Sequence, residues 1–113
     1  MNPAYELTIK DTLDEAFDAA RAATDAYLKE NPNNWFPCGF SWVHIKATSP
    51  VVKVLKKHFP ERCGHPSHPS GWDIWNPSGH NTQCMAAKEM GADAFARVLN
   101  AANFPCYADS RWD

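Results

Sequence analysis

The chain lacks the long apolar run and the leader segment that membrane and secreted proteins carry. No apolar stretch approaches the roughly 20 residues that span a bilayer. Residues 1–6 contain no basic segment followed by an apolar one. Hydrophobic residues make up 44% of the sequence and charged residues 21%, which is typical of a globular domain. We therefore expect no secretory signal, no membrane partner and a cytoplasmic location.

An excess of charge of either sign is also absent. The 11 basic and 13 acidic residues leave a formal net charge of −2. The only basic cluster is formed by Lys53, Lys56 and Lys57. Proteins that bind duplex nucleic acid nonspecifically neutralise phosphates with many basic residues. The sequence therefore argues against duplex nucleic acid as a partner, and it lacks the acidic density of a nucleic-acid mimic.

Familiar catalytic and phosphate-binding motifs are missing as well. The sequence contains no Walker or dinucleotide-binding glycine pattern, no G-x-S-x-G and no H-E-x-x-H. Paired carboxylates such as Asp14 and Glu15 fall at a predicted helix start, where the helix dipole explains them. No catalytic residue and no cofactor can be assigned, and the sequence favours a binding protein over an enzyme.

Four cysteines, at positions 38, 63, 84 and 106, are spread evenly along the chain. Without an export signal, this spacing favours reduced thiols over a disulfide framework. Cys63, His65 and His68 form a C-x-H-x-x-H pattern in a proline-rich connection, and such side chains can bind zinc. Because the spacing matches no standard zinc motif, we expect no metal site.

At 113 residues, the chain is long enough for one hydrophobic core and too short for two, so we expect a single domain over residues 1–113. The expected elements are an edge strand over 1–11, helices over 12–30, 50–59 and 82–103, strands over 35–47, 71–75 and 104–108, and an irregular connection over 60–71. This order predicts an α+β fold in which about three helices pack on one face of a small three- to four-stranded antiparallel or mixed sheet.

Local signals carry these predictions. Thr12 and Glu15 match a capping box. Ser49 is typical of an N-cap, and Pro50 suits the first position of a helix. Aromatic and β-branched residues over 40–45 are typical of a central strand. The first two signals predict where helices begin, and the third predicts the strand between them.

The polar turn over residues 76–81 joins a predicted strand to the longest predicted helix. A helix start has unpaired backbone N–H groups and the positive end of the helix dipole, so this turn suits an anion or a polar ligand. Lys88 lies in the apolar arc of the helix and would be directed at the space beside the turn. Alternatively, the turn residues serve only capping, and the Lys88 stem packs while its ammonium reaches water.

Five tryptophans, at positions 35, 42, 72, 75 and 112, are many for this length. In a regular strand, Trp72 and Trp75 would lie on opposite faces. Such rings can stack a nucleobase, fill the core or cover a dimer interface, which makes a homodimer a further expectation. Arg111, in an aromatic-flanked terminal segment, can clamp a phosphate with its guanidinium.

Three segments, over residues 36–43, 75–83 and 107–113, are similar in sequence to segments of known proteins. They read FPCGFSWV, WNPSGHNTQ and YADSRWD, and they resemble small proteins of tailed-phage genomes that have no established activity. The likeness covers most of residues 35–113, although the connection with Cys63, His65 and His68 does not share it. The resemblance implies a setting in a phage-infected bacterial cytoplasm, where small accessory proteins block host factors or sequester nucleotide signals made during defence.

The leading hypothesis is a phage accessory protein that binds a small anionic ligand, a nucleotide or a nucleotide-derived defence signal, without turnover. An inhibitor that binds a host or defence enzyme is the alternative, and a small hydrolase or transferase is the third reading. The candidate ligand-binding residues are Trp42, Trp72, Trp75, Asn76, Ser78, Gly79, His80, Asn81, Gln83, Lys88 and Arg111.

Overall fold

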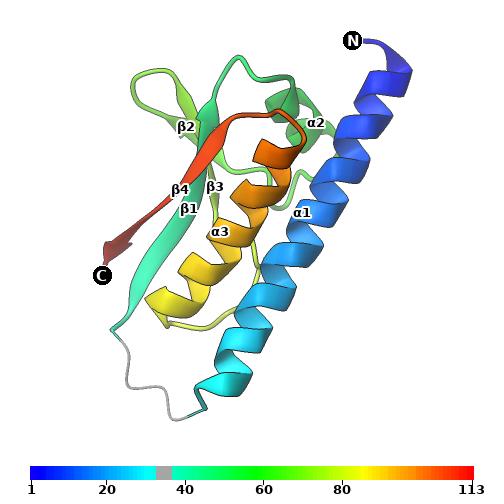
Figure 1. The fold of residues 1–113 in the computed structure, drawn as a ribbon. Coiled ribbons are helices and arrows are strands. Elements are labelled where there is room, and N and C mark those ends of the chain that lie inside the picture. Colours follow the sequence, from blue (N-terminus) through cyan, green and yellow to red (C-terminus); the bar gives the residue numbers. More distant parts are fainter. Residues whose placement is uncertain (33–36) are drawn as a thin grey trace.

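The computed structural model describes residues 1–32 and 37–113. Within this part, three helices pack on a four-stranded antiparallel sheet, which confirms the α+β class (Figure 1). The predicted strand start at Trp35 and Phe36 lies outside the described residues. The elements are α1 (Pro3–Glu30), β1 (Gly39–Lys46), α2 (Pro50–His58), β2 (His65–Ser67), β3 (Gly71–Trp75), α3 (Met85–Ala101) and β4 (Cys106–Trp112).

The N-terminal helix α1 corrects the expected edge strand over residues 1–11. It begins at Pro3, and Asn2 caps it by accepting a hydrogen bond from the Ala4 N–H at 2.7 Å. Thr12 lies inside the helix, where its hydroxyl donates to the Thr8 carbonyl, so the capping-box prediction is wrong. Tyr5 and Ile9, four residues apart, also share one side of a helix, whereas Leu7 is exposed. Burial selects the helix, because Ile9 and the residues that follow it at helical spacing face the core.

The sheet has the strand order β2-β3-β1-β4, with every neighbouring pair antiparallel. From β1 to β4 the connectivity is β-α-β-β-α-β, the split arrangement of the ferredoxin-like motif, and α1 precedes it.

Two predicted strand regions need correction. The connection over 60–71 contains the edge strand β2, which is too short to show alternation. The last strand begins at Cys106 and extends to Trp112 rather than ending at Ala108.

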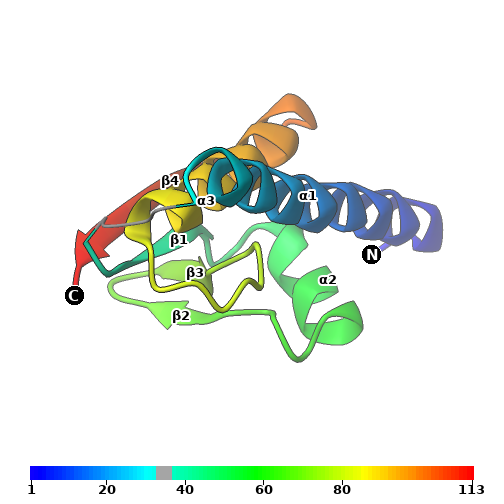
Figure 2. The same cartoon turned by 90° about the horizontal axis from the view of Figure 1, so that it is seen from below.

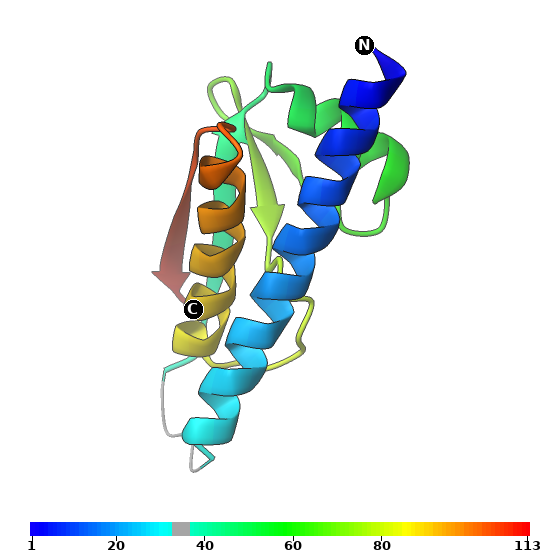
Figure 3. The same cartoon turned by 45° about the vertical axis from the view of Figure 1, so that its right-hand side comes forward.

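The helices lie on one face of the sheet, where α1 and α3 run side by side (Figure 2). The core between the layers contains Val43, Ile45 and Ile74 from the strands and Phe95 and Leu99 from α3, all with at most 2% of their surface exposed. Figure 3 shows the same two helices in front of the strands. No helix of the described chain covers the opposite face of the sheet, so most side chains there remain partly open to solvent, although Asp73 is buried.

Close contact between α1 and α3 depends on small and polar residues. The fully buried Thr24 of α1 donates its hydroxyl to the Ala87 carbonyl of α3 at 2.7 Å. Gly91 of α3 faces the same place, and a side chain there would begin 2.6 Å from the Thr24 hydroxyl. The glycine therefore permits the short interhelical distance.

Among the described residues, no helix combines the length and the apolar character needed to cross a membrane.

Candidate functional site

The helix-free side of the sheet, which we call the open face, is built from alternate residues of all four strands. Directly paired residues point to the same face of a sheet, so the register defines rows across it. One row runs through Trp75, Trp42 and Asp109. The next row runs through His65, Asp73, His44 and Tyr107, and Phe40 pairs with Arg111. The open face thus combines several aromatic rings with three charged residues, Asp73, Asp109 and Arg111.

Three of these rings, Phe40, Trp42 and Trp75, form what we call the aromatic cluster. The ring centroids of Trp42 and Trp75 are 4.8 Å apart, and Phe40 meets Trp75 edge-on at 5.9 Å. His65 extends the cluster by stacking on Trp75 at 5.7 Å. All three cluster residues are only partly buried. A partly exposed aromatic surface of this kind can stack a flat ligand.

Trp72 does not reach the aromatic cluster. It is 6% exposed on the inner face of β3, where its indole N–H donates to the Cys63 carbonyl at 2.6 Å. The predicted separation of Trp72 from Trp75 is confirmed. The Trp75 indole nitrogen is buried and finds no acceptor in the described part of the chain. The structure therefore brings Trp42 and Trp75 together and places Trp72 in the core.

Two cations flank the aromatic cluster. The Arg111 guanidinium carbon lies 5.5 Å from the Phe40 ring centroid and 5.9 Å from that of Trp75. The Lys88 ammonium lies 5.4 Å from the Phe40 centroid and donates to the Gly39 carbonyl at 2.9 Å. Within the described residues, neither cation forms an ion pair with a carboxylate. In this part of the chain, no carboxylate therefore neutralises either charge, although the Lys88 ammonium is engaged by the Gly39 carbonyl.

The polar turn over 76–81 satisfies many of its own polar groups. The Asn76 amide donates to the His80 carbonyl at 2.8 Å, and the Ser78 hydroxyl donates to the Asn76 side chain at 3.1 Å. The His80 ring in turn accepts from the Thr82 N–H at 2.9 Å. Asn76 and Gly79 adopt positive φ angles of 42° and 69°. These contacts explain the turn by local structure, as the capping alternative proposes.

The long helix begins later than predicted, at Met85 instead of Thr82. Its N-cap is Cys84, whose sulfur accepts from the Ala87 N–H at 3.4 Å. The unpaired N–H groups of the helix start therefore do not lie in the turn. Gln83 and Asn81 are exposed, and the Gln83 carbonyl accepts from the Gly39 N–H at 3.3 Å. The expected grouping of Lys88 with the turn is replaced by a grouping of Lys88 with Phe40 and Arg111.

A hollow of about 360 Å³ adjoins the aromatic cluster at the edge of β2. It is lined by Glu61, Arg62, Gly64, His65 and Trp75. The Arg62 guanidinium lies 4.1 Å from the Phe17 ring centroid, which holds this cation in place beside the hollow. The sequence offered no sign of Arg62 as a site residue, and it pointed to His65 only as a possible zinc ligand, because the connection that carries both residues has no periodic pattern.

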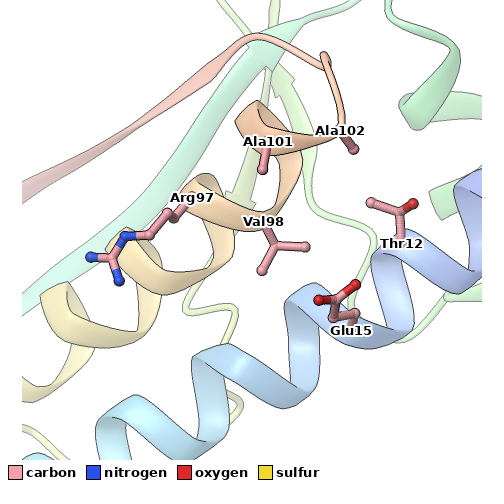
Figure 4. Close-up of a pocket in the computed structure, with 6 residues that line it drawn as sticks. All are labelled: Thr12, Glu15, Arg97, Val98, Ala101 and Ala102. Carbon is pink, nitrogen blue, oxygen red and sulfur yellow. The ribbon is translucent and has the colours of Figure 1, made fainter.

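A second hollow of about 360 Å³ lies between α1 and α3. It is lined by Thr12, Glu15, Arg97, Val98, Ala101 and Ala102. Figure 4 shows Thr12 and Glu15 on α1 across from Val98, whereas the Arg97 guanidinium points away. No tryptophan lines this hollow, so it lacks the stacking surface that the open face provides.

His44 and Asp73 form a polar pair in the middle of the open face. His44 Nδ1 lies 2.7 Å from Asp73 Oδ1, and the His44 ring lies against Tyr107 in a tilted contact with centroids 5.1 Å apart. A side chain at Gly71 would collide with the His44 ring, so the glycine gives the imidazole its place. A carboxylate at Nδ1 orients a histidine so that Nε2 can accept a proton. The sequence did not reveal this pair, which depends on the register between β1 and β3.

Among the described residues, no group of three or more histidine, cysteine or acidic side chains is arranged to hold a metal ion. Cys63 and His65 make other contacts: the Cys63 thiol donates to the Pro60 carbonyl at 3.6 Å, and the His65 ring lies against Trp75.

Comparison of the chain with models of known families, with characterised proteins and with solved structures finds no match.

Proposed function

We propose that the protein binds a small anionic, nucleotide-like ligand on the open face of its sheet. The observation that carries this proposal is the aromatic cluster of Phe40, Trp42 and Trp75 with two cations beside it, Arg111 and Lys88, neither of which forms an ion pair among the described residues. A nucleobase would stack on Trp42 or Trp75, and a phosphate would be held by Arg111 and Lys88. These contacts support binding without turnover, so that the protein would sequester its ligand.

Stacking and charge make separate contributions to such binding. Stacking of a base on an aromatic side chain contributes roughly 1–3 kcal/mol and tolerates any base. A guanidinium binds a phosphate with two parallel hydrogen bonds, which adds both affinity and orientation. The net charge of −2 argues for a mononucleotide or another short ligand over a long polyanion. The resemblance to small tailed-phage proteins adds one candidate source, the nucleotide signals of bacterial defence.

Calorimetry with a panel of linear and cyclic nucleotides tests the proposal. We expect one or more nucleotides to bind the wild-type protein and to bind Trp75→Leu and Arg111→Gln at least tenfold more weakly. Asn76→Ala should bind nearly as well as the wild type, because Asn76 serves the turn. No heat of binding with any nucleotide, at protein concentrations that detect millimolar affinity, would overturn the proposal.

A protein partner is the second candidate, and the surface of β4 favours it. This strand lies at the edge of the sheet, and two of its residues, Tyr107 and Trp112, are 57% and 65% exposed. An edge strand with exposed aromatic anchors can pair with a strand of another protein or of a second copy. Sedimentation of the wild type and of Tyr107→Ser/Trp112→Ser tests the second copy. A dimer that is lost in the double variant would place the homodimer interface on β4.

The His44–Asp73 pair favours turnover as a third candidate. If Asp73 accepts the proton of His44 Nδ1, the free Nε2 can act as a general base toward a bound ligand. Chromatography of a bound nucleotide after long incubation tests this reading. Slow conversion that is abolished in His44→Ala, with binding retained, would identify an enzyme. An unchanged nucleotide in both samples would leave sequestration as the function.

A further inference from the structure

Cys38 and Cys84 face each other across an isolated antiparallel bridge between the residue before β1 and the N-cap of α3. The neighbouring residues make the hydrogen bonds of this bridge: Gly39 N–H donates to the Gln83 carbonyl at 3.3 Å, and Met85 N–H donates to the Pro37 carbonyl at 3.2 Å. The two cysteines are therefore a non-hydrogen-bonded pair. In such pairs the Cα atoms lie about 4.5 Å apart and the side chains lean toward each other.

We propose that Cys38 and Cys84 form a reversible disulfide, so that this bridge is a site of oxidative modification. A Cα separation of about 4.5 Å falls within the range of roughly 4.4–6.8 Å that disulfides occupy. Both thiols are free in the structure, and Cys38 is exposed whereas Cys84 is 4% exposed. At this separation, rotation of the two side chains can bring the sulfur atoms together.

The other two cysteines have different surroundings. The Cys106 thiol donates to the Ala96 carbonyl at 3.6 Å, and burial raises its pKa to about 11, which keeps it protonated and unreactive at neutral pH. Cys63 lies near the Pro60 and Gly64 carbonyls, away from any bridge partner in the described chain. These two residues therefore serve as internal controls for the pair at the bridge.

Oxidised glutathione is the oxidant class for which the reaction balances. The exposed Cys38 thiolate attacks one glutathione sulfur, forming a mixed disulfide and releasing one reduced glutathione. The Cys84 thiolate then attacks the Cys38 sulfur of the mixed disulfide and releases the second glutathione. Two protein thiols are oxidised, one glutathione disulfide is reduced, and both thiol protons end on the released glutathione molecules. The burial of Cys84 assigns it the second, intramolecular step.

The proposed disulfide would connect the two segments that carry Lys88 and Phe40. Those segments are otherwise joined at this point by the bridge hydrogen bonds and by the Lys88 ammonium on the Gly39 carbonyl. Oxidation would thus hold one border of the aromatic cluster in place. The inference rests on the bridge geometry alone and holds whether or not the open face binds a nucleotide.

The test uses the full chain in glutathione buffers of increasing oxidised fraction, followed by alkylation of free thiols and peptide mass mapping. We expect a Cys38–Cys84 disulfide in the wild type and in Cys63→Ser/Cys106→Ser. Cys84→Ser should instead accumulate a glutathione adduct on Cys38. Since the bond closes a long loop, oxidation should also raise the melting temperature by about 5 °C or more.

Serine can replace Cys84 as an N-cap, so the Cys84→Ser variant is expected to fold and to remain informative. Reduction with dithiothreitol should return the wild-type melting temperature to its starting value. A stable glutathione adduct on Cys38 of the wild type, a disulfide that involves Cys63 or Cys106, or no intramolecular disulfide at all would each overturn the proposal.

Discussion

Trp42 of β1 and Trp75 of β3 lie directly opposite each other, with ring centroids 4.8 Å apart and ring planes inclined by 36°. The two residues are 33 positions apart in the sequence, and only the pairing of β1 with β3 brings them together. Their shared surface, bordered by Phe40 and Arg111, is the centre of the proposed binding site.

Replacing Trp75 by leucine should weaken nucleotide binding by roughly tenfold to a hundredfold, because one stacking surface is lost. The apolar leucine should keep the sheet folded. Calorimetry measures the affinity, and circular dichroism measures the fold. Trp112→Leu is the matched control, since Trp112 pairs with Gly39 and is not part of the aromatic cluster. Equal affinities of the Trp75→Leu variant and the wild type would remove the stacking contribution from the proposal.

Replacing Arg111 by glutamine should weaken binding by about tenfold and make the remaining affinity less sensitive to salt. The reason is the loss of one charge that no carboxylate neutralises in the described structure. Binding titrations between low and high ionic strength measure both effects. Arg21→Gln is a suitable control, because Arg21 on α1 already pairs with Asp25 at 3.2 Å. The same salt dependence in both variants would contradict the role given to Arg111.

Replacing Gly91 by alanine should destabilise the protein by about 1–2 kcal/mol, although alanine favours helix formation. The new methyl group would lie 2.6 Å from the Thr24 hydroxyl, 2.9 Å from Ser78 Cβ and 3.1 Å from the Ala20 carbonyl. Denaturant unfolding measures the change. In a Thr24→Ala background the added loss should be smaller, because the closest atom is gone. An increase in stability from Gly91→Ala would show that the helices can separate without cost.

The Glu6 contacts predict a loss of stability at acid pH. Hydrogen bonds from Lys57 and then His58, at 2.9 and 3.0 Å, lower the pKa of Glu6 below its ordinary value of 4.5. A carboxyl whose pKa is lower in the folded state stabilises that state above the unfolded pKa, and this contribution disappears as the pH falls through the folded pKa.

Thermal unfolding of the wild type and of Glu6→Gln, from pH 6 to pH 3, tests this dependence. The stability difference between the two proteins should be largest above pH 4.5 and should shrink as the pH falls below it. Lys10→Gln, which removes an intrahelical pair with Asp14, controls for general effects of charge on α1. A difference that grows on acidification would reverse the sign of the argument.

The start of helix α2 could be predicted from the sequence alone. Ser49 and Pro50 were predicted as its cap and first residue, and the structure confirms both, with the Val51 N–H donating to the Ser49 hydroxyl at 3.3 Å. Such signals operate within a few residues, so the sequence carries them completely. The N-terminal segment shows the limit of the same reasoning. The alternation of Tyr5, Leu7 and Ile9 predicted a strand, whereas in the helix Leu7 is exposed and Ile9 is buried in the core.

The candidate site was predicted only in part, because sequence signals operate within a few residues and the site joins distant segments. Trp42, Trp75, Lys88 and Arg111 were all named from the sequence, yet the sequence grouped Lys88 with the polar turn. In the structure Lys88 reaches the Gly39 carbonyl instead, because α3 begins at Met85 and lies against the start of β1. The His44–Asp73 pair and the hollow beside Trp75 had no local signal. The pair joins two strands, and the hollow lies between Trp75 of β3 and the segment that leads into β2.

The sequence by itself determined the α+β class, the presence of β1 and α2, and the opposite orientations of Trp72 and Trp75. These features depend on periodicity and capping, which are properties of neighbouring residues. Tertiary structure alone decided which aromatic rings share the open face and which cysteines face each other. Both depend on strand register and on the packing of α3, which are set by burial of the whole core.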